Sequence, residues 1–334
     1  MSIQMLPYSH IIAIAETWRA MGGVPSVEIG ALEPLLWRDG HYRIHDAVQA
    51  LHERGFTISL TTNGQLLENY AVDLGRAGLS LLRISWHSMD PLMFKEMSGG
   101  HGDYRRFLRG ITLALESGIP IAFNRVLHKG QCDDLPVQLE YIERYKSRLK
   151  LFTLLWTPGS AATYDAFYQD WRPIVRKHVL PRTMRIVRKQ QTLGRPRLGF
   201  QLTAGGSVEV KLSDRLDRNA EPCRSCSYAT TCEEEFGDYV RIDPRLHLYF
   251  CYMRRDVGFQ ILEYLGKPEA LKQKMQEILG QEVTERFLTM SSLRLTVSPV
   301  CNFNCRSPGA SQGWCLEEPG EYIYPVLRPS LLAR

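Results

Sequence analysis

Four cysteines in the second half of the chain have a spacing typical of metal ligands. Cys223, Cys226 and Cys232 lie close together in EPCRSCSYATTC, and Cys251 follows in LHLYFCYMRR. Thiolates separated by two residues can share one metal, and a predicted hairpin brings the fourth cysteine toward them. Four thiolates suit tetrahedral zinc or an iron–sulfur cluster, and the spacing leaves both open. The remaining alternative is a chance group of free thiols.

A second cysteine group lies in VSPVCNFNCRSPGASQGWC, which is too rich in Gly, Pro and Ser to form a helix. It holds Cys301, Cys305 and Cys315 and no fourth cysteine. Three ligands leave a coordination position for a small molecule, whereas a structural metal site is normally closed by four. We therefore expect a metal centre that binds a ligand, with a loop of incidental cysteines as the alternative. Cys132 stands alone and is expected to be a bystander.

Composition and charge indicate a globular protein without a strong charge bias. Hydrophobic residues make up 44% of the 334 residues, charged residues 23%, and the formal net charge is +5. A basic run at 172–189 is typical of the solvated face of a helix, so nucleic acid is not expected as a partner. The start, MSIQMLPYSH, lacks a basic leader, and no apolar run approaches the roughly 18 residues of a membrane span. We expect a cytoplasmic protein, whose reduced thiols favour metal ligation over disulfides.

Apolar segments alternate with amphipathic segments of helical length along the first half of the chain. Strands are predicted at 26–30, 56–64, 81–88, 119–127 and 149–156, and helices near 8–21, 43–54, 66–77, 103–117 and 133–148. Near-continuous apolar strands separated by helices predict a parallel sheet covered by helices. In such folds the functional side chains gather where the strands end.

The second half of the chain has a different pattern. A helical stretch near 164–190 leads to short alternating strands between 198 and 256, where YVRIDPRLHLYFC predicts a hairpin. Two helices near 260–289 follow, and a sixth apolar strand at 293–300 directly precedes Cys301. The four-cysteine group thus lies in the hairpin region, and the three-cysteine group follows a strand like the first five.

Several segments resemble motifs of the radical S-adenosylmethionine (radical SAM) enzyme superfamily. LRLTVSPVCNFNC resembles the first strand and cluster loop, IGALEPLL the GGEP segment, LTTNGQLL the third-strand TTNG, and LRISWHSMDPLMFKEMSGG the fourth-strand serine region. The four-cysteine hairpin resembles the auxiliary-cluster region called twitch or SPASM. By size and layout the chain is similar to the cyclase branch that begins molybdenum-cofactor synthesis.

The order of the motifs departs from the family, in which the cluster loop comes first. Moving residues 290–334 to the front would join them to LPYSHIIAIAETW, the expected first barrel helix. The resemblance therefore implies a circular permutation, which is tolerated where termini are close and exposed.

The fold class that the resemblance implies is α/β. It is a partial (β/α)6 TIM-like barrel, circularly permuted, with a small β-hairpin auxiliary-cluster region inserted before the relocated first strand. Residues 1–190 would form the radical SAM barrel with strands two to six. Residues 191–289 would form the auxiliary-cluster region with its helices, and 290–334 the relocated first strand and cluster loop.

The resemblance also implies which residues bind the cofactors. Cys301, Cys305 and Cys315 would ligate a [4Fe–4S] cluster whose fourth iron takes the amine and carboxylate of S-adenosylmethionine. The other cofactor-binding positions that match the family are Gly30, Ala31, Glu33, Ser85, Asn124, Arg125 and Trp314. Structural roles are the alternatives: a strand end and turn for the GALEP segment, which has one residue more than GGEP, and an ion pair on the fifth strand. His87 is a weak candidate for a catalytic proton donor, with a satisfied structural histidine as the more favoured alternative.

Together these motifs imply an enzyme that reductively cleaves S-adenosylmethionine to a 5′-deoxyadenosyl radical and modifies a small molecule or short peptide. Cys223, Cys226, Cys232 and Cys251 would hold a second, auxiliary [4Fe–4S] cluster, with zinc less favoured. A flavodoxin- or ferredoxin-type protein would supply the electron. The alternative is a degenerate iron–sulfur or zinc-binding scaffold, which the altered GGEP segment and the displaced third cysteine would suit.

The third ligand of the first cluster can be tested by mutation. Family spacing would place that cysteine at 308, where the chain has Pro308, whereas Cys315 follows Trp314 as the family's third cysteine follows an aromatic residue. We predict that Cys315→Ala loses the cluster as fully as Cys301→Ala, measured as iron content after anaerobic reconstitution. Cys132→Ala is the control and keeps its iron. A Cys315→Ala protein that still cleaves S-adenosylmethionine would exclude Cys315 as a ligand.

Overall fold

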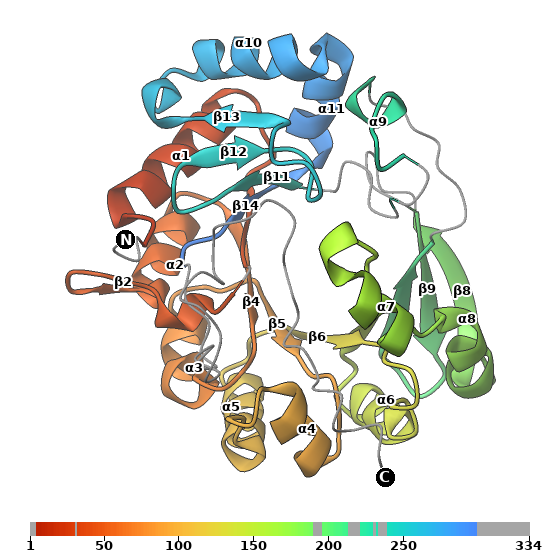
Figure 1. The fold of residues 1–334 in the computed structure, drawn as a ribbon. Coiled ribbons are helices and arrows are strands. Elements are labelled where there is room, and N and C mark those ends of the chain that lie inside the picture. Colours follow the sequence, from red (N-terminus) through yellow and green to blue (C-terminus); the bar gives the residue numbers. More distant parts are fainter. Residues whose placement is uncertain are drawn as a thin grey trace.

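The computed structural model describes residues 5–30, 32–189, 196–212, 221–229, 232 and 239–298. Within these residues one sheet of twelve strands forms the centre of the molecule. Figure 1 shows this sheet curving, with helices along its convex side. The concave side, which we call the inner face, is the one turned away from those helices.

Parallel pairing dominates the sheet. The order across it is β13 (Gly258–Gln260), β12 (His247–Tyr249), β11 (Tyr239–Ile242), β14 (Ser292–Leu295), β1 (Ser26–Ile29), β4 (Thr57–Thr62), β5 (Leu81–Ser85), β6 (Ile121–Val126), β7 (Arg148–Phe152), β10 (Ser207–Lys211), β9 (Arg197–Leu202) and β8 (Thr183–Lys189). The run from β11 to β10 is parallel throughout, and antiparallel strands extend it at both ends. A short ribbon, β2 (Arg38–Asp39) with β3 (Tyr42–Arg43), lies apart from this sheet.

Helices that alternate with the parallel strands cover the convex side (Figure 1). They are α1 (Tyr8–Ala20), α2 (Ile44–Glu53), α3 (Leu67–Arg76), α4 (Pro91–Met97), α5 (Tyr104–Glu116) and α6 (Leu135–Arg144). The later helices are α7 (Ala161–Phe167), α8 (Trp171–Ile174), α9 (Glu221–Arg224), α10 (Pro268–Leu279) and α11 (Gln281–Met290). None of the helices described is long and apolar enough to cross a membrane.

Local sequence explains why these helices begin and pack as they do. In α5 the Asp103 side chain accepts a hydrogen bond from the backbone N–H of Arg106 at 3.0 Å, which caps the first turn. Phe107, Ile111 and Ala114 then recur at helical spacing and are buried. This apolar stripe holds the helix against the sheet.

The predicted alternation of strands and helices in the first half of the chain is confirmed, with boundaries that differ by a few residues. The sheet and its helices form the expected partial TIM-like α/β fold. The sixth strand also lies where the resemblance implies. β14 pairs in parallel with β1, with Val27 opposite Leu293 and Ile29 opposite Leu295.

The chain near its two ends meets beside β14. The backbone N–H of Leu6, just before α1, donates to the carbonyl of Val297 at 2.9 Å. The expected proximity of residues 1 and 334 lies outside the described residues. The origin of this arrangement by circular permutation stays a prediction.

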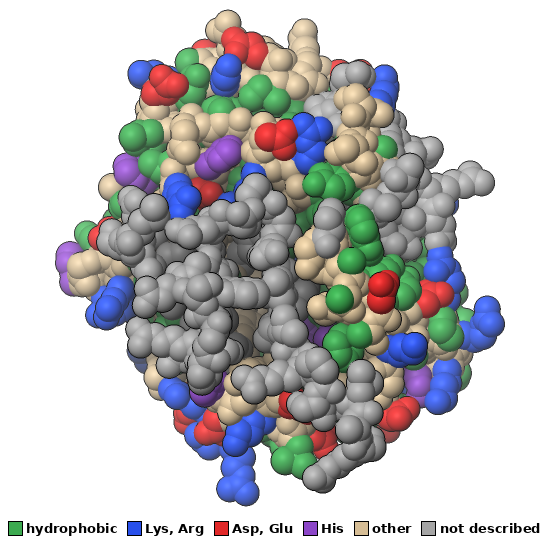
Figure 2. All heavy atoms as spheres, in the orientation of Figure 1, with side chains coloured by type: hydrophobic (Ala, Val, Ile, Leu, Met, Phe, Trp, Pro, Cys, Tyr) green, Lys and Arg blue, Asp and Glu red, His purple; other side chains and the backbone are tan. Residues whose placement is uncertain are grey.

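The helix predicted near 164–190 is wrong in its second half. After α8 a π-helical turn (Val175–Val179) and a 3-10 turn (Leu180–Arg182) end the helical segment, and β8 follows. Pro181 cannot continue a helix, and Ile186 pairs antiparallel with Phe200 of β9. The basic run therefore ends on an edge strand rather than on a helix face. Figure 2 shows Lys and Arg side chains along the right-hand edge, over β8 and α8.

The strands expected to form a small inserted region join the main sheet instead of forming a sheet of their own. β10 pairs in parallel with β7, and β11 pairs in parallel with β14. The hairpin predicted at Asp243–Pro244 is confirmed as β11 and β12. The boundaries proposed for the three parts of the chain stay predictions.

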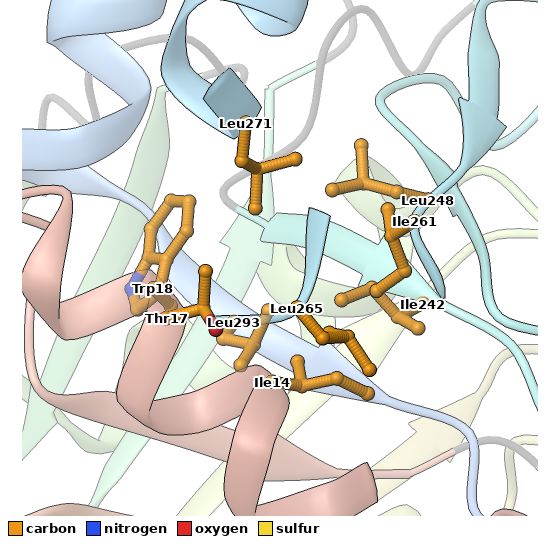
Figure 3. Close-up of a pocket in the computed structure, with 9 residues that line it drawn as sticks. All are labelled: Ile14, Thr17, Trp18, Ile242, Leu248, Ile261, Leu265, Leu271 and Leu293. Atoms are coloured by element: carbon orange, nitrogen blue, oxygen red, sulfur yellow. The ribbon is translucent and has the colours of Figure 1, made fainter. Parts of the chain in front are cut away.

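Apolar packing fills the space between sheet and helices. Trp86 lies within 5.1–5.4 Å, centroid to centroid, of Phe107, Phe123 and Tyr141, which joins β6 to α5 and α6. Figure 3 shows a small apolar pocket between α1, α10 and the strands β11, β12 and β14. The hydroxyl of Thr17, the one polar side chain that lines it, already bonds the backbone of Ala13 and Gly266. This pocket is a packing gap and offers no reactive group.

The turn before β10 allows a test of how tightly that strand joins the sheet. Gly206 has a φ of +76°, and a Cβ there would lie 2.7 Å from the carbonyl oxygen of Ile142 and 2.8 Å from that of Ser147. Gly130 has a φ of +74° with nothing within 4 Å. We predict that Gly206→Ala lowers the free energy of unfolding by about 2–4 kcal/mol, because φ strain and a backbone clash add.

Gly130→Ala is the matched control, since it carries the φ strain without the clash. It should cost about 1 kcal/mol in urea unfolding. Equal losses in the two variants would contradict the close approach of the turn to α6.

Candidate active site on the inner face of the sheet

A buried carboxylate links three neighbouring parts of the inner face. Glu28 of β1 accepts a hydrogen bond from Arg83 of β5 at 3.0 Å and pairs with Arg294 of β14 at 3.6 Å. Arg83 also donates to the Ser59 hydroxyl of β4 at 2.6 Å. These contacts require all four side chains to face the same side of the sheet. We call Glu28, Arg83 and Arg294 the Glu28 cluster.

The charge state of Glu28 follows from its neighbours. Its side chain is 6% exposed, and burial alone would favour the protonated form. Arg294, Arg83 and a hydrogen bond from Tyr239 outweigh this and hold the pKa of Glu28 below its usual value. The carboxylate is therefore charged at neutral pH and is flanked by two cations.

A second charged group lies across the inner face on β7 to β10. Glu209 pairs with Lys189 at 3.1 Å and with Arg197 at 3.2 Å, and Lys150 stands opposite it in the β7–β10 register. Burial opposes ionisation, yet Arg197 and Lys150 keep the pKa of Glu209 lowered. In these two groups of described residues, two carboxylates thus face five cationic side chains, which gives the groups together an excess of positive charge.

Ser85 and Asn124 lie together on the inner face between these charged groups. They are register partners, with Ser85 at the end of β5 and Asn124 within β6, and Asn124 is in turn opposite Lys150. Both side chains are half-buried. Their contact with the cofactor stays a prediction.

His87 follows β5 on the same side as Ser85. Its Nδ1 accepts a hydrogen bond from the backbone N–H of Val126 at 3.1 Å. Burial, with His128 and Arg125 nearby, lowers the pKa of His87 to about 3. The ring is neutral at physiological pH, so it does not serve as an imidazolium acid there.

Arg125 does not join this group. Its guanidinium is fully buried and bonds Asp134, the Gln138 side chain at 3.1 Å and the backbone carbonyl of Gln131 at 2.9 Å. Asn124 and Arg125 are consecutive on β6 and so face opposite sides. These contacts favour the alternative, a structural ion pair, and contact of Arg125 with the cofactor carboxylate stays a prediction.

Glu33 anchors the segment that resembles GGEP to the end of β4. Its side chain is fully buried and accepts from Leu35 N–H at 3.0 Å, the Thr62 hydroxyl at 2.8 Å and Asn63 N–H at 2.9 Å. Burial outweighs these bonds and raises the pKa of Glu33 to about 7. Leu32, in the same segment, has a φ of +54°, which is uncommon for a residue other than glycine.

Gly30, directly after β1, extends the pairing of β1 with β14. Its N–H donates to the carbonyl of Leu295 at 3.0 Å, and a Cβ at this position would lie 3.2 Å from the guanidinium of Arg294. Ala31, Trp314, Cys301, Cys305 and Cys315 lie outside the described residues. Binding of the methionine amine by the 30–33 segment stays a prediction.

The four-cysteine group is only partly brought together. Burial raises the pKa of the Cys251 thiol, the backbone N–H groups of Arg254 and Met253 point to its sulfur, and Cys232 is close enough to affect it. The Arg254 side chain lies against Cys226. These donors suit thiolates. Nevertheless, among the residues that the structure describes, no three Cys, His, Asp or Glu side chains lie close enough to hold a metal. The auxiliary cluster stays a prediction.

Cys132 is separate from that group. It is buried, and its thiol donates to the carbonyl of His128 at 3.4 Å.

Sequence reasoning missed the Glu28 cluster. The sequence did contain a signal. Glu28 and Arg83 are charged residues between apolar neighbours in predicted strands, and because side chains alternate along a strand, each must point to the face opposite its apolar neighbours. Arg294 has the same kind of position in LRLTV. That these three side chains contact one another follows from the order of the strands in the sheet, and the alternation of apolar and charged residues does not predict that order.

Glu33 generates a prediction with a defined pH dependence. Glu33→Gln cannot accept from all three donors, so we predict a loss of about 1–3 kcal/mol in the free energy of unfolding. Because the folded pKa is above the unfolded value of 4.5, the wild type loses stability as the pH rises from 4.5 to about 7. The glutamine variant lacks this titration. Its deficit should therefore be larger near pH 5.5 than near pH 8, by urea unfolding.

Glu116→Gln, on the exposed end of α5, is the control and should show neither effect. A Glu33→Gln deficit that is the same at both pH values would contradict a raised pKa at Glu33.

Part of the chain is similar to known proteins. Residues 3–141 match the family described as Radical SAM superfamily. The chain is similar to a probable GTP 3',8-cyclase of Archaeoglobus fulgidus, 31% identical over 186 residues that cover 54% of this chain and 59% of that protein. It is also similar to the GTP 3',8-cyclase of Petrotoga mobilis, 37% identical over 131 residues that cover 39% of each chain. The chain spans about half the length of the curated relatives it matches.

Solved structures are more distant. The crystal structure of SuiB from Streptococcus suis aligns with a TM-score of 0.38 at 18% identity, covering 46% of this chain and 35% of that one. The family match and the curated relatives agree in one respect: over residues 3–141 the chain is similar to the radical SAM superfamily.

Proposed function

We propose that this protein is a radical SAM enzyme that reductively cleaves S-adenosylmethionine and acts on a small, negatively charged molecule bound at the inner face. The observation that carries the choice of substrate is the Glu28 cluster. Two arginines share one carboxylate there, next to a second cation-rich group around Glu209. An excess of positive charge on a concave surface attracts anions.

The curated relatives support a small substrate of this kind. They are named GTP 3',8-cyclases, and GTP carries a triphosphate. The inner face offers Arg83, Arg294 and Lys150 at strand positions on both sides of Ser85 and Asn124. A small anion therefore suits this face better than a short uncharged peptide does.

The cofactors that we propose are a [4Fe–4S] cluster and S-adenosylmethionine. Cys301, Cys305 and Cys315 would hold the cluster, and it would supply the electron that cleaves the sulfonium. In the sequence these residues follow strand β14, which pairs with β1 and lies beside Gly30. A small redox protein would supply the electron.

The auxiliary cluster and the permuted order of the chain are part of the same proposal. The buried Cys251, whose sulfur faces the backbone N–H groups of Arg254 and Met253, supports a second cluster held by Cys223, Cys226, Cys232 and Cys251. The pairing of β14 with β1 and the bond between Leu6 and Val297 support a permutation.

Cleavage of S-adenosylmethionine separates an enzyme from a degenerate scaffold. We predict that anaerobically reconstituted protein produces 5′-deoxyadenosine with dithionite, and that Cys301→Ala does not. Cys132→Ala is the control and remains active. A wild-type protein that holds iron but yields no 5′-deoxyadenosine would favour the scaffold.

The anion preference is tested with GTP as the probe. Arg294→Met should weaken GTP binding by about tenfold or more in equilibrium dialysis, because a charged hydrogen bond is lost. Arg109→Met, which breaks an exposed pair with Glu68 on the convex side, is the matched control and should bind as the wild type does. Equal binding by Arg294→Met and the wild type would place the anion elsewhere.

A further inference from the structure

The backbone beyond β5 orients His87 toward the inner face. The N–H of Trp86 donates to the carbonyl of Asn124 at 2.8 Å, so strand-like pairing continues past Ser85. Trp86 packs against the aromatic rings of the convex side. Because side chains alternate along an extended chain, His87 faces the same side as Ser85.

The hydrogen bond at Nδ1 decides which nitrogen carries the proton. The backbone N–H of Val126 donates to Nδ1 at 3.1 Å, so this nitrogen supplies its lone pair and cannot hold a proton. In the neutral ring the proton must then be on Nε2. The side chain is thus held as a hydrogen-bond donor with a fixed direction.

The surroundings keep the ring in this state. The charged and titratable groups nearest to it are Arg125 and His128, and both disfavour the imidazolium. Asp134 is taken up by Arg125, Ser88 and the backbone of Met89. Within the described part of the chain, no carboxylate therefore stabilises a second proton on His87.

Nε2–H donates to no acceptor among the residues that the structure describes. Within these residues His87 makes the bond to Val126 and no other, and the ring is half-buried beside Ser85 and Asn124. A partly exposed N–H with a fixed direction toward a concave, cation-rich surface is positioned to donate to a molecule that binds there.

We propose that His87 is a positioning residue whose Nε2–H donates to an acceptor oxygen of the molecule bound at the inner face. This proposal rests on the proposed function in that the inner face is where the molecules bind. The acceptor is a carboxylate, phosphate or carbonyl oxygen, and it belongs either to S-adenosylmethionine or to the substrate. Neither source requires His87 to gain or lose a proton.

Two substitutions separate the two nitrogens. In His87→Asn the amide oxygen can still accept from Val126 N–H, but no group replaces Nε2–H. In His87→Gln the amide N–H reaches toward the Nε2 position, but the bond to Val126 is lost. We expect His87→Asn to unfold at nearly the wild-type temperature and to bind either S-adenosylmethionine or GTP about tenfold more weakly. His87→Gln should show the reverse: a lower unfolding temperature and a smaller loss of binding.

The two sources are distinguished by which affinity changes. With the cluster-loaded protein, a weaker dissociation constant for S-adenosylmethionine assigns the acceptor to the cofactor. A raised KM or dissociation constant for the anionic probe GTP, with S-adenosylmethionine binding unchanged, assigns it to the substrate. Unchanged affinity for both in His87→Asn overturns the proposal.

A spectroscopic measurement tests the tautomer without activity. In protein labelled with ¹⁵N at histidine, the His87 signals should show a protonated Nε2 and an unprotonated Nδ1, constant between about pH 5.5 and about pH 8. Titration in this window, or a proton on Nδ1, overturns the proposal even if the enzyme is active. Failure of the proposed function would appear separately, as absence of 5′-deoxyadenosine with these nitrogen signals intact.

Discussion

The central sheet is continuous only because β14, from near the end of the chain, inserts between β11 and β1. It pairs in parallel with both neighbours, and its Leu293 and Leu295 are buried with Val27 and Ile29 of β1. Without it, β1 would expose a row of unpaired backbone groups, and the β11–β13 strands would have no link to the sheet. The same insertion brings Arg294 to Glu28, so the strand that completes the fold also completes the charged cluster.

That cluster is costly to maintain. Taking Glu28 and its arginines out of water carries a penalty that ion pairing offsets only in part, and apolar residues of similar size commonly give equal or greater stability. Buried charges in a concave surface are accordingly more typical of functional sites than of structural ones. Arg125 shows the contrasting case, since its partners Asp134 and Gln138 enclose it on the convex side.

Much of the fold could be predicted from the sequence, because its strongest signals are local. Apolar runs separated by amphipathic segments predicted strands β1, β4, β5, β6 and β7 and helices α1, α2, α3, α5 and α6 to within a few residues. The short strands β2 and β3 and helix α4 were not predicted. The family resemblance of the segment before Cys301 implied that β14 lies beside β1. The wrong prediction of a helix where β8 lies has a local cause as well. A basic segment suits a solvated helix or an edge strand equally, and pairing with β9 decides between them.

The candidate site was less predictable than the fold. Which face of β6 bears Asn124 and which bears Arg125 depends on the register with β5, and the acceptor of each buried donor depends on packing.

The outer packing also determines the direction of the inner side chains. Gln138 of α6 donates from Nε2 to the carbonyl of Trp86 at 2.9 Å and also accepts from Arg125. The Trp86 ring is enclosed by aromatic residues of β6, α5 and α6. Once Trp86 is held on the convex side, the alternation of the chain leaves Ser85 and His87 only the inner face. The groups that face the inner surface are therefore oriented by contacts on the opposite side of the sheet, and a change in α6 acts on the site through the backbone of residues 85–87.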